Sequence, residues 1–111
     1  MSAGQSWKTR FDINLHQAEA ARAVGNEGKA RVCARRAAGI VVEEYLRRQG
    51  LQLTQASAYA QLRFLADQAE VAPAVRSVAG HFLLHVSVEH KLPLEADLID
   101  EALWLASQLL S

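Results

Sequence analysis

Histidine and glutamate side chains repeat at intervals of four residues in the last third of the chain. His81, His85 and Glu89 follow one another at this spacing, which places them along one side of a helix. Imidazole and carboxylate groups so placed can bind zinc or iron. A metal site in a bundle draws ligands from several helices, however, and only His16 and His90 are further imidazoles. The alternative is that His81 and His85 flank a buried stripe and form hydrogen bonds, so we predict no metal cofactor.

Basic side chains form one local cluster, which consists of Lys29, Arg31, Arg35 and Arg36. Helical spacing divides the cluster into two flanks, Lys29 with Arg36 and Arg31 with Arg35, on either side of an alanine-rich face. Either flank could bind a nucleotide or RNA phosphate near the positive end of the helix, and we favour Arg31 with Arg35. The alternative is a solvated edge, because no aromatic residues are interleaved for base stacking.

Glu44 is unusual because helical spacing places it within the apolar stripe of the same segment. A buried carboxylate needs a cationic partner or a raised pKa. Arg48 follows four residues later and is the predicted partner. Cys33 shares this face and is interpreted as a small core residue, since no nearby group is placed to stabilise a thiolate.

The elements that must position these side chains are helices, because apolar residues recur at three- and four-residue spacing along nearly the whole chain. We predict five helices, at about residues 7–24, 27–49, 54–69, 73–86 and 95–109, with either Thr54 or Ser57 as the cap of the third. Asn26 can cap the second helix, Gly50 can end it, and Pro73 suits the first turn of the fourth. Short connections favour antiparallel neighbours. The predicted fold is an all-α, up-and-down antiparallel helical bundle that forms a single domain over residues 1–111.

Composition limits the functional classes. The 111 residues match one domain, and 12 Lys and Arg balance 12 Asp and Glu, so no net charge attracts nucleic acid or an anionic membrane. A single cysteine forms no intrachain disulfide, which favours a cytoplasmic location. No apolar run approaches the roughly 18 residues of a membrane span. We therefore expect no membrane interaction.

Several large apolar residues fall outside the main helical stripes and would be exposed on an isolated bundle. They are Val42, Leu46, Leu84, Leu103 and Leu110. Exposed apolar surface of this extent is typical of an interaction site. We therefore predict a homodimer with two-fold symmetry.

The first two predicted helices resemble the HEPN family, named for higher-eukaryote and prokaryote nucleotide-binding domains. The similarity lies in Ala18-Glu19-Ala20-Ala21 up to the turn at Gly25, then in Ala30 and Ala34-Arg35-Arg36-Ala37-Ala38. The chain departs from the family pattern at Gly39 and Glu43, where many members have a Glu and then a Lys. The resemblance implies a helical module that dimerises and binds a partner protein or a nucleotide-type ligand, which is our leading hypothesis.

HEPN members that cleave RNA use an Arg and a His separated by four to six residues, and Arg76 and His81 fit this spacing. The resemblance therefore implies an alternative, a metal-independent ribonuclease or toxin-like enzyme. His81 lies five positions after Arg76, and at about 100° per residue the two side chains point roughly 140° apart around a continuous helix. A dimer would therefore have to bring them together. Because catalysis is not needed to explain any residue, the leading hypothesis is non-catalytic.

Overall fold

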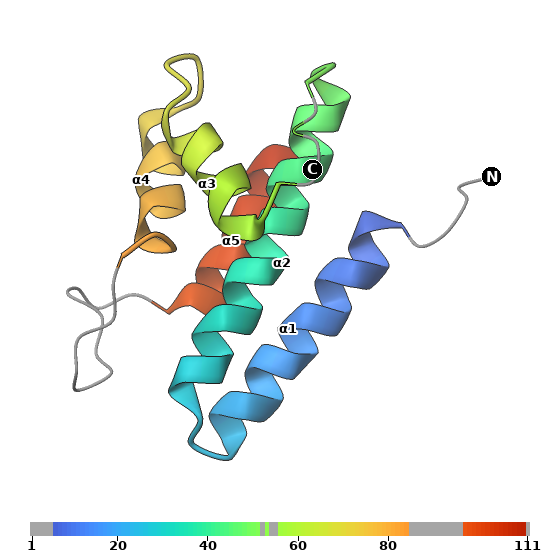
Figure 1. The fold of residues 1–111 in the computed structure, drawn as a ribbon, viewed down its shortest axis with the longest axis vertical. Coiled ribbons are helices and arrows are strands. Elements are labelled where there is room, and N and C mark those ends of the chain that lie inside the picture. Colours follow the sequence, from blue (N-terminus) through green and yellow to red (C-terminus); the bar gives the residue numbers. More distant parts are fainter. Residues whose placement is uncertain (1–5, 52, 54–55, 85–96, 111) are drawn as a thin grey trace.

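Five α-helices build the part of the chain that the computed structural model describes, residues 6–51, 53, 56–84 and 97–110 (Figure 1). They are α1 (Trp7–Ala23), α2 (Glu27–Arg48), α3 (Ala58–Ala66), α4 (Pro73–His81) and α5 (Leu98–Leu110). The predicted all-α bundle is confirmed. None of these helices is both long enough and apolar enough to cross a membrane.

Helices α1 and α2 form an antiparallel hairpin (Figure 1). Gly25 has a φ of 80°, a conformation that favours glycine, and it reverses the chain after α1. The next residue, Asn26, caps α2 because its side-chain oxygen accepts a hydrogen bond from the Lys29 amide at 3.1 Å. The predicted turn and cap are therefore confirmed.

Helix α2 is the centre of the bundle and packs against α1, α3 and α5. Its buried positions are mostly small: Ala30, Cys33, Ala34, Ala37, Ala38, Gly39, Val41, Val42 and Leu46. Small side chains let several helices approach one axis closely. Burial of Val42 and Leu46 contradicts their predicted exposure, because α2 is covered on several sides.

The apolar surface that led to the homodimer prediction is therefore largely covered within one chain. Leu110 is also buried and Leu84 is half-buried, whereas Leu103 remains exposed. The dimer itself stays a prediction, but it now depends mainly on Leu103.

The closest approach in the bundle is between α2 and the start of α3. A Cβ atom added to Gly39 would lie 2.6 Å from the Cβ of Ala58 and 2.8 Å from its Cα. Helix α3 begins at this point because the Ser57 hydroxyl accepts a hydrogen bond from the Ala60 amide at 3.1 Å. The absence of a side chain at Gly39 therefore permits the close approach of α3 to α2 at this point.

Helix α4 ends at His81, earlier than the predicted 73–86 helix. Phe82 and Leu83 donate their backbone amides three residues back, to Ala79 and Gly80, which tightens the last turn. The Phe82 carbonyl accepts a hydrogen bond from Arg35 Nε at 3.2 Å. Val86 lies outside the described residues. Helix α3 likewise ends at Ala66, before the predicted residue 69.

Substitution Gly39→Ala is expected to lower the free energy of unfolding by about 1–3 kcal/mol, because the new methyl group overlaps backbone and side-chain atoms of Ala58. Gly80→Ala is the matched control, since an added Cβ there meets no atom within 4 Å. The control should be neutral or stabilising by up to about 1 kcal/mol. Urea unfolding of both variants measures the difference, and equal stabilities would contradict the close packing.

Candidate functional site: the groove between α1 and α2

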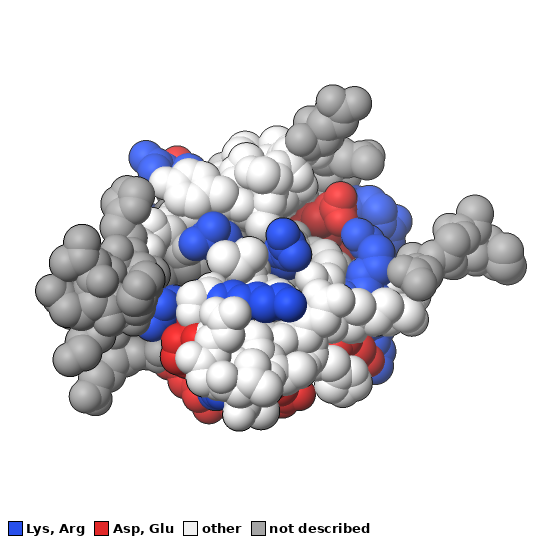
Figure 2. All heavy atoms as spheres, turned by 60° about the horizontal axis from the view of Figure 1, so that its bottom comes forward, with Lys and Arg blue, Asp and Glu red and all other residues white. Residues whose placement is uncertain are grey.

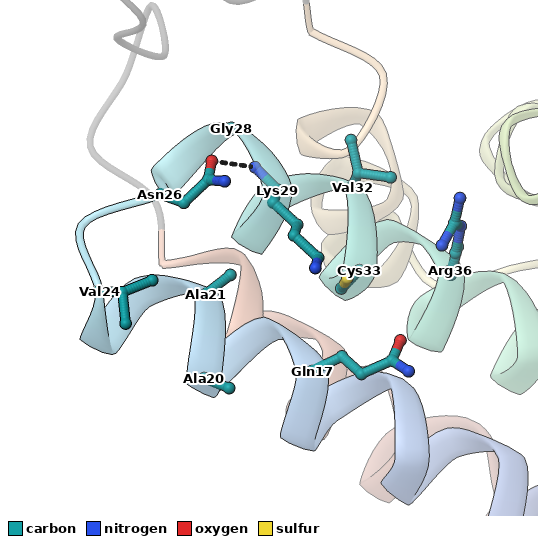
Figure 3. A pocket seen from close by; sticks show the side chains of 10 residues that line it. All are labelled: Gln17, Ala20, Ala21, Val24, Asn26, Gly28, Lys29, Val32, Cys33 and Arg36. Atoms are coloured by element: carbon teal, nitrogen blue, oxygen red, sulfur yellow. Dashed lines mark hydrogen bonds between the residues drawn. The ribbon is translucent and has the colours of Figure 1, made fainter.

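An open groove of about 820 Å³ runs between α1 and α2 (Figure 3). Helix α1 lines it with Gln17, Ala20, Ala21 and Val24, and α2 lines it with Gly28, Lys29, Val32, Cys33 and Arg36, with Asn26 at the turn. On both helices these positions repeat at three- and four-residue spacing, which keeps them on one face. The groove therefore follows the axes of the hairpin for about two helical turns.

The centre of the groove is apolar and small. Ala21 and Cys33 are buried, whereas Val24 and Val32 remain 81% and 38% exposed. Small residues between two helices allow a third element to approach closely, and exposed valines supply apolar contact area. The groove thus has the composition of a helix-packing surface without a third helix on it among the described residues.

The charge along the groove is positive. Lys29 and Arg36 line it, no carboxylate does, and neither side chain forms a hydrogen bond or ion pair with another described residue. Figure 2 shows basic side chains at this end of the molecule on a mostly uncharged face, with acidic atoms toward its margins. The groove can therefore attract an anionic partner.

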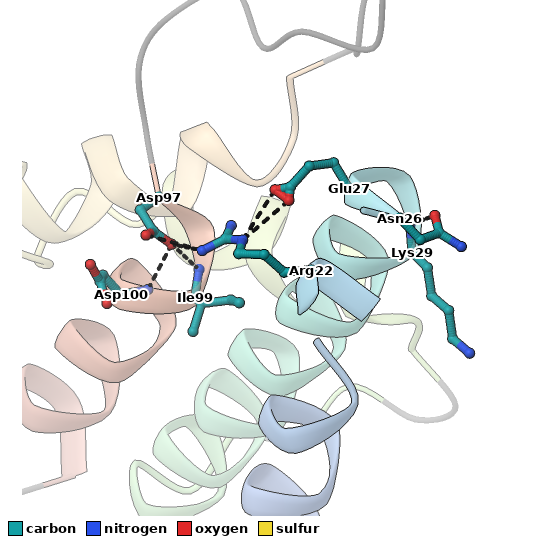
Figure 4. A network of polar contacts seen from close by, with 7 residues as sticks. All are labelled: Arg22, Asn26, Glu27, Lys29, Asp97, Ile99 and Asp100. Atoms are coloured by element: carbon teal, nitrogen blue, oxygen red, sulfur yellow. Dashed lines mark hydrogen bonds and ion pairs between the residues drawn. The ribbon is translucent and has the colours of Figure 1, made fainter. Parts of the chain in front are cut away.

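Glu27, at the start of α2, is directed away from Lys29 (Figure 4). Both of its carboxylate oxygens accept hydrogen bonds from Arg22 Nε at 3.1 Å (Figure 4). The picture shows Glu27 directed to Arg22 while Lys29 extends away from this network. Because Arg22 binds Glu27, the positive charge of Lys29 is left to face the groove.

Arg22 also fixes α5 to the hairpin. Its Nη1 donates to the two carboxylate oxygens of Asp97 at 3.0 and 3.1 Å, and Asp97 in turn caps α5 by accepting from the Ile99 and Asp100 amides. Partial burial raises the pKa of Asp97, but the hydrogen bonds from Arg22 and the amides outweigh it, so the pKa lies below its ordinary value. The network joins α1, α2 and α5 at one end of the groove.

The basic cluster separates into the two flanks that helical spacing requires. Lys29 and Arg36 are exposed and line the groove, whereas Arg31 and Arg35 are partly buried on the other flank. Arg35 is engaged with the carbonyl oxygen at the end of α4. Arg35, on the flank that we predicted as the polar contact, therefore joins α2 to the end of α4. The exposed cations are Lys29 and Arg36, on the other flank.

Arg76 and His81 do not meet in this chain. Helix α4 is continuous from Pro73 to His81, so the two side chains point in different directions, and no contact joins them among the described residues. His81 Nδ1 lies 2.8 Å from Glu101 Oε1 on α5, and both side chains are partly buried. Arg76 Nε is buried and has no hydrogen-bond partner among the residues that the structure describes. His81 thus joins α4 to α5.

The proposed metal ligands are only partly described. His85 and Glu89 lie outside the described residues, and His81 is directed to Glu101. No group of three or more potential ligands gathers in the part of the chain that the structure places.

Glu44 has the predicted partner and a second one. Its side chain is only 11% exposed, and it accepts hydrogen bonds from Arg48 Nε at 2.9 Å and from both Nε and Nη2 of Arg47. The hydrogen bond from Arg47, together with that from Arg48, outweighs the effect of burial and lowers the pKa of Glu44 to about 2. The pair with Arg48 is confirmed, and the charge of Glu44 is satisfied within α2.

Sequence reasoning missed the α1 side of the groove. Gln17, Ala20 and Val24 read as an ordinary exposed face, because polar and small residues alternate there. The sequence does contain a signal for the groove. Each of the two helices carries a face of residues at three- and four-residue spacing, and the glycine turn makes the helices antiparallel neighbours. That signal becomes useful only once the hairpin is known.

Comparisons with known proteins found no family model, no curated protein and no solved structure that matches the chain. The functional argument therefore depends on the groove itself.

Glu44→Gln is expected to destabilise the protein at pH 7 and to lose this effect in acid. The native carboxyl has a pKa of about 2, below its ordinary value of 4.5, so the native state binds fewer protons than the unfolded chain between these values. The stability that Glu44 contributes above pH 4.5 therefore falls as the pH drops toward 2. Denaturant unfolding of both proteins across this range measures the gap.

Asp67→Asn is the control for this experiment, because Asp67 forms an exposed pair with Arg63 at 3.6 Å and should contribute little. A gap between the wild type and Glu44→Gln that stays constant from pH 7 to pH 2 would contradict the assigned pKa.

Proposed function

We propose that this protein is a non-catalytic, HEPN-like helical binding module whose α1–α2 groove binds an acidic amphipathic helix of a partner protein. The observation that carries the proposal is the groove itself, with exposed valines, a floor of small residues and two cations without a carboxylate. Apolar contacts would supply the affinity, and the two cations would orient the partner helix, as in other helix-in-groove complexes.

The spacing of the cations favours a helix over a single phosphate. Lys29 and Arg36 are seven residues apart, which corresponds to about 10.5 Å along α2. A partner helix that lies along the groove can present carboxylates at the same seven-residue spacing and pair with both cations. One phosphate group is much smaller than this separation and would engage one cation at a time.

A helix laid along the groove would also extend the packing of the hairpin. An α-helix with its side chains is about 10–12 Å across, and it would complete a three-helix layer with α1 and α2. Val24 and Val32, the two large apolar residues exposed in the groove, would then be covered. Burial of this kind contributes about 25 cal/mol per Å² of apolar surface.

Charge reversal tests the proposal. Two designed helical peptides carry the same apolar stripe, one with Glu and one with Lys at seven-residue spacing, and their binding is measured by fluorescence anisotropy. The wild type should prefer the Glu peptide, and the double variant Lys29→Glu/Arg36→Glu should bind it at least about tenfold more weakly, which corresponds to about 1.4 kcal/mol. The double variant should instead prefer the Lys peptide.

Arg63→Glu is the matched control, since Arg63 is exposed on α3 and outside the groove, and it should leave the preference unchanged. Equal binding of the two peptides would contradict the proposal. So would binding of a nucleotide or RNA that depends on Lys29 and Arg36, or occupation of the groove by a second copy of the chain, seen as a doubled solution mass that the double variant loses.

A further inference from the structure

A second hollow, of about 390 Å³, lies where α1 and α2 meet the start of α3. Its polar lining consists of Arg10 and Asn14 from α1, Arg36 and Glu43 from α2, and Gln61 from α3. Ile40 and Ala58 form part of its apolar wall. Small-molecule sites have this volume and this mixture, an apolar surface with a few convergent polar groups.

Gln61 is the feature that packing does not explain. It is only 3% exposed, and its Oε1 is buried without a hydrogen-bond partner in the described structure. Its neighbours on α3, Leu62 and Leu65, fill the core with apolar side chains. A buried amide oxygen without a donor destabilises a protein, so a polar residue at this position needs a reason. A bound molecule that donates hydrogen bonds would provide it.

The other polar groups of this hollow supply hydrogen-bond acceptors and a cation. Glu43 accepts from Arg10 at 3.3 Å through Oε1, which leaves Oε2 as a further acceptor. Asn14 donates its amide nitrogen to the Arg10 carbonyl at 2.9 Å, so its side-chain oxygen is not used in that bond. The Arg36 side chain is exposed and forms no hydrogen bond or ion pair with another described residue. Three acceptors and one available guanidinium therefore border the same space.

We propose that this hollow binds a small zwitterionic ligand of the α-amino-acid class. The ammonium group would donate to the oxygens of Gln61, Asn14 and Glu43, and the carboxylate would accept from the Arg36 guanidinium. An aliphatic side chain would lie against Ile40 and Ala58. This site is separate from the α1–α2 groove and shares only Arg36 with it.

Isothermal titration calorimetry with a panel of free α-amino acids tests the proposal, using the full chain. At least one amino acid should bind the wild type, and Gln61→Leu should weaken that binding at least tenfold. Because Leu removes the unpaired amide, this variant should be as stable as the wild type or more so, which separates a ligand role from a structural one. Asn14→Ala, at a half-exposed position, is the second variant and should also weaken binding.

Two sets of controls make the result specific. Lys29→Glu changes the α1–α2 groove alone and should leave amino-acid binding unchanged, so failure of one proposal does not imply failure of the other. Methylamine and acetate each carry one of the two charges, and each should bind at least tenfold more weakly than the amino acid. Absence of binding by every amino acid would overturn the proposal, as would equal binding of acetate or undiminished binding by Gln61→Leu and Asn14→Ala.

Discussion

The fold depends on the close packing of several helices around α2. Helices α1, α3 and α5 all contact it, and this is possible because its inward positions are alanine, glycine and cysteine over much of its length. At Gly39 the constraint is strictest, since even a methyl group would overlap Ala58. The start of α3, which borders the hollow that contains Gln61, can lie this close to α2 because residue 39 has no side chain.

The same packing explains why the groove is open. The buried residues of α2 face α3, α5 and the inner side of α1, so Lys29, Val32 and Arg36 are left on the flank that no described helix covers. Arg22 then binds Glu27 and Asp97, which joins α5 to the end of the hairpin and keeps the Glu27 carboxylate directed away from Lys29 (Figure 4). Stability and surface charge are therefore linked, because the ion pairs that join the helices also leave the groove positive.

Local signals predicted much of the fold, and contacts distant in sequence account for the rest. Asn26, Pro73 and the pair of Glu44 with Arg48 act within a few residues, so spacing alone indicated them. Arg35 on α2 contacts the carbonyl just after α4, and Val42 and Leu46 are buried because several helices surround α2. Periodicity within one segment predicts neither of these contacts. The sequence predicted the candidate site only in part. Lys29 and Arg36 were identifiable as members of a basic cluster. Gln17, Val24 and Gln61 line hollows only because of their neighbours on other helices.

The most direct test of the binding-module proposal is a nuclear magnetic resonance titration of the ¹⁵N-labelled protein with the acidic helical peptide. The proposal predicts that the largest amide shifts fall along the groove, at Gln17, Ala20, Val24, Lys29, Val32 and Arg36, with small changes on α4 and α5. Shifts centred on α4 and α5, or no shifts at peptide concentrations that saturate the anisotropy signal, would contradict it.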